Sequence, residues 1–558
     1  GNDITGNEAS ASKSVRSETL ETETSLPNFR QGDAIILYER NRDTDNVTNK
    51  MVFKGNIEYL TENEIGIRLR ATQQNPSVLP AESLYAIEHD TMDTTFRSMY
   101  QGLYIYLSAR KERRDLLLSQ RPPRFDESLD SMISRSEDDF TRIALKAKAA
   151  QDYFLLIGPP GTGKTSCALK KMVETFHADK DAQILLLSYT NRAVDEICKS
   201  LASIAPAVDF IRVGSELSCD EAYRGHLIEN ELSSCNRRSE VYERIRNCRI
   251  IVGTVAAISG KPELFRLKHF DVAIIDEATQ ILEPQLLGIL CARGEDGKDA
   301  IDKFVLIGDH KQLPAVVQQN TEQSAIYDES LLSIGLTNLK DSLFERLYRN
   351  CTATVHRSYD MLCRQGRMHP EVALFANRAF YGGRLIPVGL PHQIESSDTI
   401  CRLAFYPSVP EKAGASAKIN YSEARIVADL AVRIYEDHQT DFDESRTLGI
   451  ITPYRSQIAL IKKEIESLGI PALNRILVDT VERFQGSERD VIIYSFCVNY
   501  PYQLKFLSNL TEEEGVLIDR KLNVALTRAR KQMFITGVPE LLERNPLYKS
   551  LLKLIESF

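Results

Sequence analysis

Short apolar runs recur along most of this chain of 558 residues, separated by polar turns and by stretches with the 3.6-residue period of helices. Near-continuous apolar runs that alternate with helical stretches are typical of parallel strands with helices on both faces of the sheet. The runs form two sets, at residues 153–157, 183–188, 249–253, 271–276 and 303–308, and at residues 448–453, 475–481, 491–496 and 533–537. The pattern predicts two α/β domains with parallel sheets, over residues 125–350 and 351–558.

The region before residue 125 has a different pattern. Residues 1–27 are rich in Ser, Thr and acidic residues without a sustained apolar period, which predicts a flexible lead-in or the start of a stalk. Residues 28–92 are expected to form a small β-barrel or an open sheet, because they contain four short runs of β type, at residues 34–38, 51–55, 64–68 and 84–88.

Two further segments are helical by pattern. Residues 94–121 have the period of one long helix, within a stalk segment at 93–124. The seven basic residues of this segment are open to two interpretations, a solvated helix face or contacts to phosphates. Residues 214–247 are polar and helix-prone without a strand signal, which predicts a helical insertion into the first α/β domain.

Composition and charge narrow the class of protein. The chain has 69 Lys and Arg against 78 Asp and Glu, a net charge of −9 that gives no whole-molecule attraction to nucleic acid but does not exclude a basic groove. No run approaches the ~18 apolar residues of a membrane span, and the first residues lack a signal-peptide pattern, so we expect a cytoplasmic protein, nuclear in a eukaryote. The ten cysteines lie singly, which predicts a reducing compartment and no structural zinc or iron–sulfur cluster within these residues.

Residues 158–165 read Gly-Pro-Pro-Gly-Thr-Gly-Lys-Thr and match a phosphate loop between an apolar run and a helix that begins near Ser166. Backbone N–H groups of such a turn point into one concavity, and the helix N-terminus adds positive potential for phosphates. Lys164 is expected to bridge the β- and γ-phosphates, and the Thr165 hydroxyl to bind Mg²⁺. The predicted ATP-binding residues of the loop are Gly158, Pro159, Gly161, Thr162, Gly163, Lys164, Thr165 and Ser166.

Two carboxylates, Asp276 and Glu277, end the apolar run at 271–276. One acid at such a strand end can hold Mg²⁺ while its neighbour accepts a proton from the attacking water, so we expect Asp276 to bind the metal and Glu277 to act as the base. Strand-terminal acids also cap helices, but a preceding phosphate loop in a parallel sheet favours the catalytic interpretation. Gln312, in the polar turn after 303–308, has the reach to touch the γ-phosphate or the attacking water.

This combination resembles the superfamily 1 helicases, over nearly all of residues 150–540. In that family the Asp-Glu-Ala-Thr-Gln at 276–280 is motif II. The other matching segments are residues 188–195 (motif Ia), 308–314 (motif III), 365–370 (motif IV), 452–457, 478–490 (motif V) and 522–530 (motif VI). Within the family the chain is most similar to the branch of the replication helicase/nuclease that trims Okazaki flaps and the RNA helicase of nonsense-mediated decay.

The resemblance implies a fold and a substrate. It implies two RecA-like motor domains with ATP in the cleft between them, preceded by a small β-barrel on a helical stalk, and 5′-to-3′ movement along a single strand. Likeness to the flap-processing enzyme around 188–194 and 152–153 favours DNA over RNA. No nuclease is visible in the sequence, so any nuclease or regulatory region would lie upstream of Gly1, and the chain itself is expected to be a monomer.

Phosphoryl transfer needs more positive charge on the γ-phosphate than Lys164 alone provides. By motif position Arg367 and Arg528 are the candidates, with a structural salt bridge as the alternative for each. Both lie in the second α/β domain, so each can reach ATP only when the two domains close on it. Glu488, by its place in motif V, is expected to contact the ribose.

The chain departs from the family at the adenine site. Phe140 stands where relatives have the base-reading glutamine, and Gly366 stands where they have a tyrosine before the motif IV arginine. Stacking by Phe140 or Tyr153 is one replacement, and a core role is the alternative for both aromatics. We therefore expect loose base recognition.

Superfamily motors hold a single strand across both motor domains with loop N–H groups and hydroxyls, and with aromatic or proline side chains against the bases. Helix capping is the alternative role for Thr190, Asn191 and Thr452. By motif position the predicted nucleic-acid contacts are Thr190, Asn191, Gly253, Thr254, Pro314, Thr452, Tyr454, Thr480 and Arg483.

These features predict a helicase or translocase that uses ATP and Mg²⁺ and acts on single-stranded or tailed nucleic acid, with no membrane partner. An RNA helicase of the same branch is one alternative, because motif residues do not encode recognition of the 2′-OH group. An ATP-gated clamp that holds a strand without unwinding it is another, since a clamp needs the same residues. A small-molecule kinase or transport ATPase fits poorly, because motifs Ia, V and VI have no counterpart there.

Overall fold

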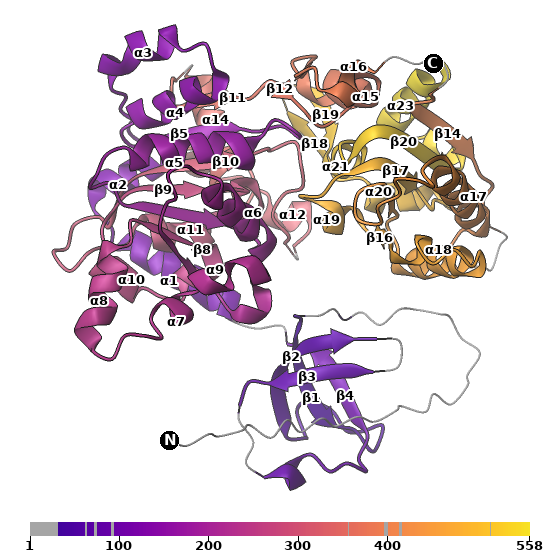
Figure 1. The fold of residues 1–558 in the computed structure, drawn as a ribbon, viewed down its shortest axis with the longest axis horizontal. Helices are drawn as coiled ribbons and strands as arrows, with labels where there is room; N and C mark the ends of the chain where they lie inside the picture. The colour runs from indigo at the N-terminus through magenta and orange to yellow at the C-terminus, as the bar shows by residue number, and fades with distance from the viewer. Residues whose placement is uncertain are drawn as a thin grey trace. The chain divides into compact units, whose positions relative to one another are not determined.

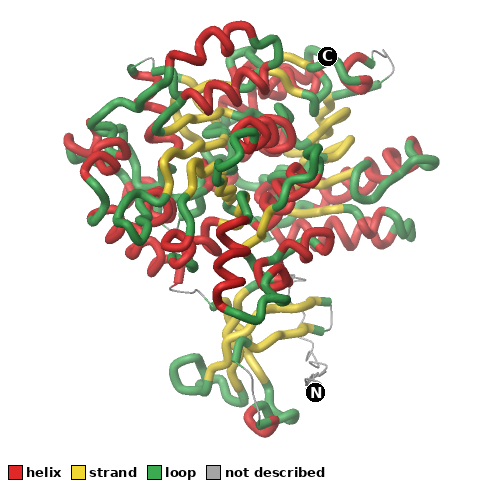
Figure 2. The backbone as a smooth tube through the Cα atoms, turned by 60° about the vertical axis from the view of Figure 1, so that its left-hand side comes forward, coloured by secondary structure: helices red, strands yellow, loops and turns green. Residues whose placement is uncertain are grey.

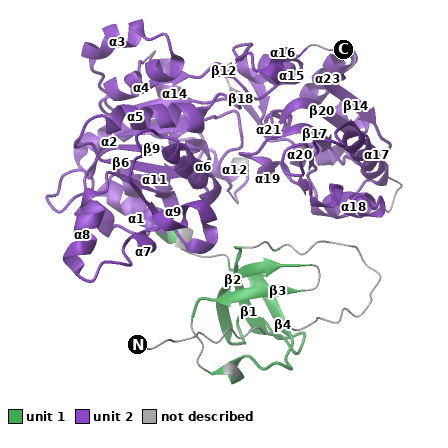
Figure 3. Ribbon diagram, viewed as in Figure 1, with its two compact units in different colours: residues 1–97 green, residues 98–558 purple. Residues whose placement is uncertain are grey.

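The computed structural model describes residues 29, 32–61, 64–71, 75–90, 94–317, 319–354, 356–395, 400–411, 416–513 and 515–558 (Figure 1). Residues 32–90 are mainly strands, whereas in the rest of the described chain helices surround the strands of two sheets (Figure 2). The chain divides into two compact units, residues 1–97 and 98–558 (Figure 3). The lead-in predicted at 1–27 lies outside the described residues. Among the described residues no helix is both long and apolar enough to span a bilayer.

The first compact unit contains a four-stranded antiparallel sheet of order β3-β2-β1-β4. Ile35, Tyr38, Phe53 and Ile57 supply its buried side chains. Because β3 and β4 end the order at opposite edges, the described strands form an open sheet and not the closed barrel. The strands are β1 (Ala34–Glu39), β2 (Val52–Leu60), β3 (Ile65–Leu69) and β4 (Tyr85–His89).

The stalk segment forms two helices, α1 (Thr94–Leu107) and α2 (Lys111–Leu117), so the prediction of one long helix was wrong. The backbone of Arg110 is extended between them, with a ψ of 145°. Arg113 is buried in α2 and donates to the backbone carbonyls of Ile301 and Asp302. This docking of α2 onto the first α/β domain needs the change of chain direction that a continuous helix would prevent.

Three basic residues of the stalk segment contact the first α/β domain. Besides Arg113, both Arg121 and Arg124 form ion pairs with Asp152 at 2.9 Å. Burial raises the pKa of Asp152, but the hydrogen bonds from the two arginines outweigh burial and hold that pKa below its usual value. These three side chains therefore anchor the segment, which is neither of the two roles that the sequence suggested for its basic residues.

Helix α1 packs backbone to backbone against α11 (Glu283–Leu290). A β-carbon added to Gly102 of α1 would lie 2.4 Å from the carbonyl oxygen of Pro284. A β-carbon added to Gly288 of α11 would lie 3.0 Å from the Cα of Gly102. Only glycine at both positions lets the two helices approach this closely.

The first α/β domain is built on a seven-stranded sheet of order β11-β5-β10-β9-β6-β8-β7, in which every pair is parallel. Successive residues of β5 alternate between two hydrophobic clusters, Tyr153 and Leu155 in one and Phe154 and Leu156 in the other. The sheet is thus buried on both faces, as its apolar runs predict. Its strands are β5 (Tyr153–Ile157), β6 (Ile184–Ser188), β7 (Phe210–Val213), β8 (Ile250–Thr254), β9 (Phe270–Ile275), β10 (Ile301–Gly308) and β11 (Tyr359–Met361).

Helices and helical turns connect these strands. Residues 216–247, at the predicted insertion, form 3₁₀ turns followed by α7 and α8. The helices of this domain, besides α11, are α3 (Asp130–Arg135), α4 (Asp139–Ala149), α5 (Lys170–His177), α6 (Asn191–Ala202), α7 (Ile228–Glu231), α8 (Arg238–Asn247), α9 (Val255–Ser259), α10 (Glu263–Leu267), α12 (Thr321–Ser324), α13 (Glu329–Ser333) and α14 (Leu343–Ala353).

The first sheet extends beyond the boundary predicted at residue 350. Strand β11 pairs in parallel with β5, with Tyr359 opposite Leu155. The chain therefore completes the first domain with an edge strand before it enters the second. This short strand has a polar centre, Asp360, so its sequence lacks the apolar run by which the other strands are recognised.

The second α/β domain has a five-stranded parallel sheet of order β14-β20-β17-β15-β16. A hairpin of β18 and β19 and the short pair β12 and β13 lie outside this sheet. The strands are β12 (Arg364–Gln365), β13 (Ile386–Pro387), β14 (Leu403–Pro407), β15 (Leu448–Ile451), β16 (Leu477–Asp479), β17 (Arg489–Ser495), β18 (Leu510–Glu513), β19 (Val516–Asp519) and β20 (Ala529–Gly537).

Helices cover both faces of this second sheet, whose β17 places Ile492 and Ile493 in different hydrophobic clusters. The longest of them, α17, follows β14. The helices are α15 (Pro370–Tyr381), α16 (Pro391–Ile394), α17 (Tyr421–Asp437), α18 (Arg455–Ser467), α19 (Val481–Phe484), α20 (Leu504–Leu507), α21 (Arg520–Leu526), α22 (Pro539–Leu542) and α23 (Pro546–Glu556).

Candidate ATP and nucleic-acid site

The phosphate loop is a tight turn between β5 and the helical turn η3 (Lys164–Leu169), which continues into α5. Gly161 and Gly163 have φ angles of 73° and 74°, in the left-handed region that disfavours residues with a β-carbon. A β-carbon on Gly158 would lie 2.7 Å from the Cβ of Lys164. The turn thus needs its three glycines, and it sets Lys164 at the start of the helix, an arrangement that fits the phosphates of a nucleotide.

Other loop residues shape the turn or face outward. Thr162 is buried, and its hydroxyl donates to the carbonyl of Pro159 at 2.7 Å. This contact closes the loop on itself. Ser166 is exposed on the first helical turn, where a hydroxyl remains accessible to a ligand.

The two residues predicted to bind the metal meet in the structure. Asp276 follows the last residue of β9 and is buried, and the hydroxyl of Thr165 donates to its Oδ2. A hydroxyl and a carboxylate oxygen are ligands that Mg²⁺ accepts. The side chains present therefore fit a magnesium ion.

Glu277 has a strained backbone and a carboxylate held by two hydroxyls. Its φ is 54°, in the left-handed region that is uncommon for a residue other than glycine and that recurs at functional sites. Ser188 and Thr190 donate to its Oε2 at 3.4 and 3.3 Å. Burial and the neighbouring Asp276 raise its pKa, whereas Lys164 and the two hydroxyls act in the opposite direction. A raised pKa makes this carboxylate a stronger proton acceptor than an ordinary glutamate.

Gln312, in the turn after β10, is buried and contacts the second domain. Its Nε2 donates to Asp309 at 2.7 Å, and its Oε1 accepts from Arg528 at 3.3 Å. The hydroxyl of Tyr381, the last residue of α15, donates to the same Asp309 oxygen at 2.7 Å and accepts from Asn523 at 2.8 Å. A continuous series of polar contacts thus joins the two α/β domains.

Arg528 is a buried cation whose hydrogen-bond acceptors in the described chain are neutral. Burial lowers its pKa to about 9, and the positive charge of Arg367 acts in the same direction. Arg528 remains charged at pH 7, and a buried cation of this kind gains most from an anionic ligand. Its acceptors are the carbonyls of Val524 and Ser487, the hydroxyl of Thr527 and the amide oxygen of Gln312.

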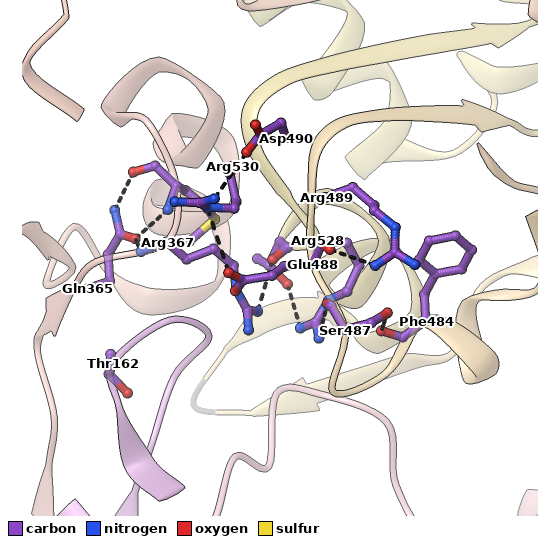
Figure 4. Close-up of polar contacts among 12 residues, drawn as sticks. Thr162, Gln365, Arg367, Phe484, Ser487, Glu488, Arg489, Asp490, Arg528 and Arg530 are labelled. Atoms are coloured by element: carbon purple, nitrogen blue, oxygen red, sulfur yellow. Dashed lines mark hydrogen bonds and ion pairs between the residues drawn. The ribbon is translucent and has the colours of Figure 1, made fainter. Parts of the chain in front are cut away.

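Arg367 lies against the phosphate loop. The Gly366 N–H donates to the Gly161 carbonyl at 2.8 Å, and a β-carbon on Gly161 would lie 2.4 Å from the Cβ of Arg367. The guanidinium of Arg367 is paired with Glu488, and Figure 4 shows this pair with Thr162 on one side and Arg528 on the other. Both the salt bridge considered for Arg367 and its predicted proximity to the nucleotide are therefore compatible with its position.

Glu488 lies among arginines. Its Oε2 accepts from Arg367, and its Oε1 lies 3.6 Å from Arg530. Burial raises the pKa of Glu488, but the charge of Arg367 and the hydrogen bond from it outweigh burial and hold the pKa below its usual value. Glu488 is therefore an acceptor at pH 7, as contact with a ribose hydroxyl requires.

The two aromatic residues considered for stacking on the base, Phe140 and Tyr153, lie in different surroundings. Phe140 in α4 lies beside the loop, because a β-carbon on Gly163 would be 3.5 Å from its ring. Tyr153 is buried and its ring stacks on Phe304 with centroids 5.5 Å apart, so it is a core aromatic. Leu390 comes within 3.2 Å of the β-carbon position of Gly366, so an aliphatic side chain lies next to the position of the relatives' tyrosine.

The predicted nucleic-acid contacts of the first domain follow neighbouring strands. Thr190 and Asn191 follow β6, and Gly253 and Thr254 end β8, which pairs with β6. Because β6 and β8 are parallel neighbours, their carboxyl ends lie side by side and bring these four residues to one edge of the sheet. The hydroxyls of Thr190 and Thr254 also cap α6 and α9, so the capping alternative holds for Thr190. Pro314 lies half-buried in the turn after Gln312.

The predicted contacts of the second domain differ in exposure. Thr452 is fully buried, and its N–H donates to the carbonyl of Asp479 at 3.2 Å, so its side chain cannot reach a strand in this structure. It does not cap α18, whose N-cap is Tyr454. Tyr454 is half-buried, Thr480 is the N-cap residue of α19, and Arg483 is exposed and lies 3.5 Å from Asp479. The side chain of Thr452 is thus the one of this group that is closed off from a ligand.

Asp309, Tyr381 and Asn523 belong to this site but were not singled out from the sequence. Asp309 and Asn523 lie inside motifs III and VI, so the motif match contained the signal for both. Tyr381 lies at the end of a helix outside the motifs. Its role depends on contacts with residues 72 and 142 positions away, which no local pattern encodes.

Two family models, each described as an AAA domain, match the chain. One matches residues 135–241 and 228–320, and the other matches residues 339–540. The first of these matches lies within the first α/β domain, and the second covers the end of that domain and most of the second α/β domain. They support a nucleotide-dependent core made of two parts.

The chain is similar to named helicases. It is 27% identical to the DNA replication ATP-dependent helicase/nuclease of Arabidopsis thaliana, over 97% of this chain and 40% of the relative, and 28% identical to that of Homo sapiens, over 94% and 49%. It is 24% identical to the DNA polymerase alpha-associated DNA helicase A of Saccharomyces cerevisiae, over 82% of this chain and 73% of the relative. The chain spans about half the length of the helicase/nucleases it matches. Among solved structures, the arterivirus nonstructural protein 10 helicase in complex with DNA matches at 16% identity and a TM-score of 0.35, over 74% of this chain and 65% of that one.

Proposed function

The chain belongs to the superfamily 1 helicases, in the branch of the DNA replication helicase/nucleases, and on this premise we propose that it unwinds DNA at the expense of ATP. Its substrate in this proposal is single-stranded or tailed DNA, along which it moves 5′ to 3′ as the resemblance to this branch implies. The alternative is that the substrate is RNA, as for an RNA helicase of the same branch.

The observation that carries the proposal is the buried Arg528, whose hydrogen-bond acceptors in the described chain are neutral. It comes from the second domain and contacts Gln312 of the first. An arginine supplied in this way to a γ-phosphate makes hydrolysis depend on closure of the two domains. Hydrolysis that depends on closure can in turn be coupled to movement along a strand.

Each residue of the proposed ATP site has a separate role in hydrolysis. Mg²⁺–ATP, when bound, supplies the γ-phosphate and a metal that neutralises its charge. Lys164 binds the phosphates, and Thr165 and Asp276 would hold the metal. Glu277 accepts the proton of the attacking water. Arg528 stabilises the charge that develops in the transition state.

The ATP site is tested by replacing Glu277, the proposed general base. Glu277→Gln should bind ATP normally but hydrolyse it at least ~10²-fold more slowly, because the amide cannot accept the proton. Asp276→Asn is the contrasting variant, which should weaken the dependence of binding on Mg²⁺. Steady-state hydrolysis and a fluorescent nucleotide titration measure both. If Glu277→Gln loses ATP affinity and keeps its rate, Glu277 binds metal and is not the base.

A strand-displacement assay tests the helicase activity and its polarity. A duplex with a 5′ single-stranded DNA tail should be unwound with ATP, and a duplex with a 3′ tail should not. An RNA tail of the same sequence compares the two substrates, and faster unwinding there would support the RNA alternative. Slow hydrolysis without displacement on every substrate would support an ATP-gated clamp instead.

A further inference from the structure

Between β17 and the hairpin of β18 and β19, the chain forms a short helical segment with two different faces. It consists of the turn η8 (Pro501–Gln503) and helix α20, labelled in Figure 1. Leu504 and Leu507 point into the hydrophobic cluster of the second domain. The other face of the segment presents Tyr502, Lys505 and Phe506 to solvent.

The aromatic residues of this segment, Tyr500, Tyr502 and Phe506, form what we call the aromatic patch. Tyr502 is 54% exposed and Phe506 is 71% exposed. The rings of Tyr500 and Tyr502 stack, with centroids 5.8 Å apart and planes at 14°, and Phe506 meets Tyr502 edge-on at 6.5 Å. Single exposed apolar residues are ordinary, but neighbouring exposed aromatic rings mark a binding surface.

Gln503 holds the aromatic patch in place and joins it to Tyr454. Its Oε1 accepts from the N–H groups of Asn499 and Tyr500 at 2.8 and 2.9 Å. Its Nε2 donates to the hydroxyl of Tyr454 at 3.1 Å. The patch is therefore fixed to the domain by a buried side chain, which also contacts a residue of the predicted nucleic-acid site.

Positive charge lies beside the aromatic patch. Lys505 is exposed on α20 between Tyr502 and Phe506. Lys418 is exposed on a neighbouring loop, whose Ala417 carbonyl accepts from Gln503 at 2.8 Å. Aromatic rings next to flexible cations match a nucleic-acid strand, because bases stack on rings while ammonium groups neutralise phosphates.

We propose that the aromatic patch is a stacking platform for unpaired bases of single-stranded DNA, an extension of the strand path beyond the motif residues. This inference rests on the proposed function, since the patch is joined through Gln503 to Tyr454, a residue of the predicted nucleic-acid site. Stacking is tolerant of sequence, so the platform would hold any base as the strand moves. Lys418 and Lys505 would contact the phosphates on either side.

The test measures how much of the affinity comes from bases. The dissociation constants of a fluorescent single-stranded DNA and of an abasic strand of equal length are measured by anisotropy, with a non-hydrolysable ATP analogue present. Tyr502→Ala/Phe506→Ala should weaken binding of the base-bearing strand by about tenfold or more. Its affinity for the abasic strand should equal that of the wild-type chain.

Two control variants isolate the effect of stacking. Tyr502→Phe/Phe506→Tyr keeps two rings and should bind both strands like the wild type. Phe558→Ala removes an aromatic residue that is 60% exposed at the chain end marked C in Figure 1, and it should change neither constant. The temperature of unfolding of each variant confirms that the fold is intact.

The outcomes separate this inference from the proposed function. If Tyr502→Ala/Phe506→Ala matches the wild type on the base-bearing strand, the platform is overturned and the helicase proposal stands. An equal loss on both strands also overturns stacking, because the patch would then contact only the backbone or support the fold. If the wild-type chain binds neither strand, the proposed function falls and this inference falls with it.

Discussion

Arg528 differs from the other deeply buried arginines of the chain in the charge of its partners. Arg212 is paired with Asp195 and Arg346 with Glu283, so in both cases a carboxylate neutralises the buried cation. The acceptors of Arg528 are neutral. A buried cation that is hydrogen-bonded to no carboxylate costs stability, and such a cost is typical of a residue kept for catalysis.

This difference predicts opposite phenotypes for two arginine variants. Arg528→Ala should lower kcat on the order of 10³-fold and leave the affinity for ATP nearly unchanged, because the charge that it stabilises develops in the transition state. Its free energy of unfolding should change little. Arg346→Ala should lower the free energy of unfolding by about 3 kcal/mol, since it leaves Glu283 without its partner. Hydrolysis kinetics and urea unfolding measure both, and an Arg528→Ala protein that hydrolyses ATP normally would refute the arginine's role.

The placement of the phosphate loop and of the motif II acids was predictable because it depends on local order along the chain. A glycine-rich turn between a buried strand and a helix is typical of a phosphate-binding loop. The position of two acids at the end of a strand is fixed by the strand that precedes them. The fate of Thr452 was not predictable from motif position, since its burial depends on how β15 and β16 pair. The same limit applies to Tyr381, which meets Asp309 only when the two domains come together.

At the scale of elements, most strands buried on both faces were predicted to within a few residues, and several edge strands were missed. β5 matches its prediction at both ends, because an unbroken apolar run has no alternative position in a parallel sheet. β7, β11 and β14 were missed. All three are short and lie at sheet edges, and two of them, β11 and β14, contain half-buried residues. The break between α1 and α2 was missed because it depends on where the side chain of Arg113 is buried.

One element boundary contains a titratable group that the motifs do not use. Glu423, in the first turn of α17, accepts from the hydroxyl of Ser495 at 2.6 Å and from the N–H of Cys497 at 2.9 Å. It thereby ties α17 to the end of β17. Burial raises its pKa from 4.5 to about 7, although the three hydrogen bonds, including one from Ser408, act in the opposite direction.

This pKa makes the stability of the second domain depend on pH. The folded chain binds the proton of Glu423 more tightly than the unfolded chain, so the stabilisation is complete below pH 4.5 and is lost as the pH rises through about 7. The loss is at most about 3 kcal/mol. Glu423→Gln should therefore show a flatter fall in stability between pH 5 and 7.5, as measured by urea unfolding. Parallel curves for the two proteins would show that Glu423 is ionised throughout this range.

At the scale of residues 98–558, two kinds of contact join the α/β domains. Arg520 of α21 and Glu345 of α14 form a buried ion pair at 2.6 Å. Tyr381 connects Asp309 of the first domain to Asn523 of the second. The sequence predicted that closure matters, because the arginines and the phosphate loop lie in different domains. The sequence could not identify the residues that favour closure. Tyr381, Arg520 and Glu345 lie outside the motifs, and Asp309 and Asn523 lie inside motifs that gave no sign of a contact between the domains.

The hydroxyl of Tyr381 should couple strand binding to hydrolysis. Tyr381→Phe removes one buried bridge between the domains, and a buried hydrogen bond of this kind is worth about 1–2 kcal/mol. The stimulation of hydrolysis by single-stranded DNA should therefore fall about tenfold. Tyr548→Phe is the matched control, because its buried hydroxyl bonds Asp519 within the second domain at 3.0 Å. That variant should lose stability and keep its stimulation, and equal stimulation in both variants would argue against the coupling role.

The contact between Gly102 and Gly288 decides where the chain can be shortened for laboratory use. Because α1 meets α11 with no side chains between the two backbones, removal of α1 uncovers the surface of α11 around Gly288. A recombinant fragment that starts at Thr94 keeps this contact, whereas one that starts at Arg110 leaves the apolar surface under Ile105 and Tyr106 open to solvent. Fragments for crystallisation or for fusion to other proteins should begin at or before Thr94. In a random mutagenesis library, few folded variants should carry a substitution at Gly102 or Gly288.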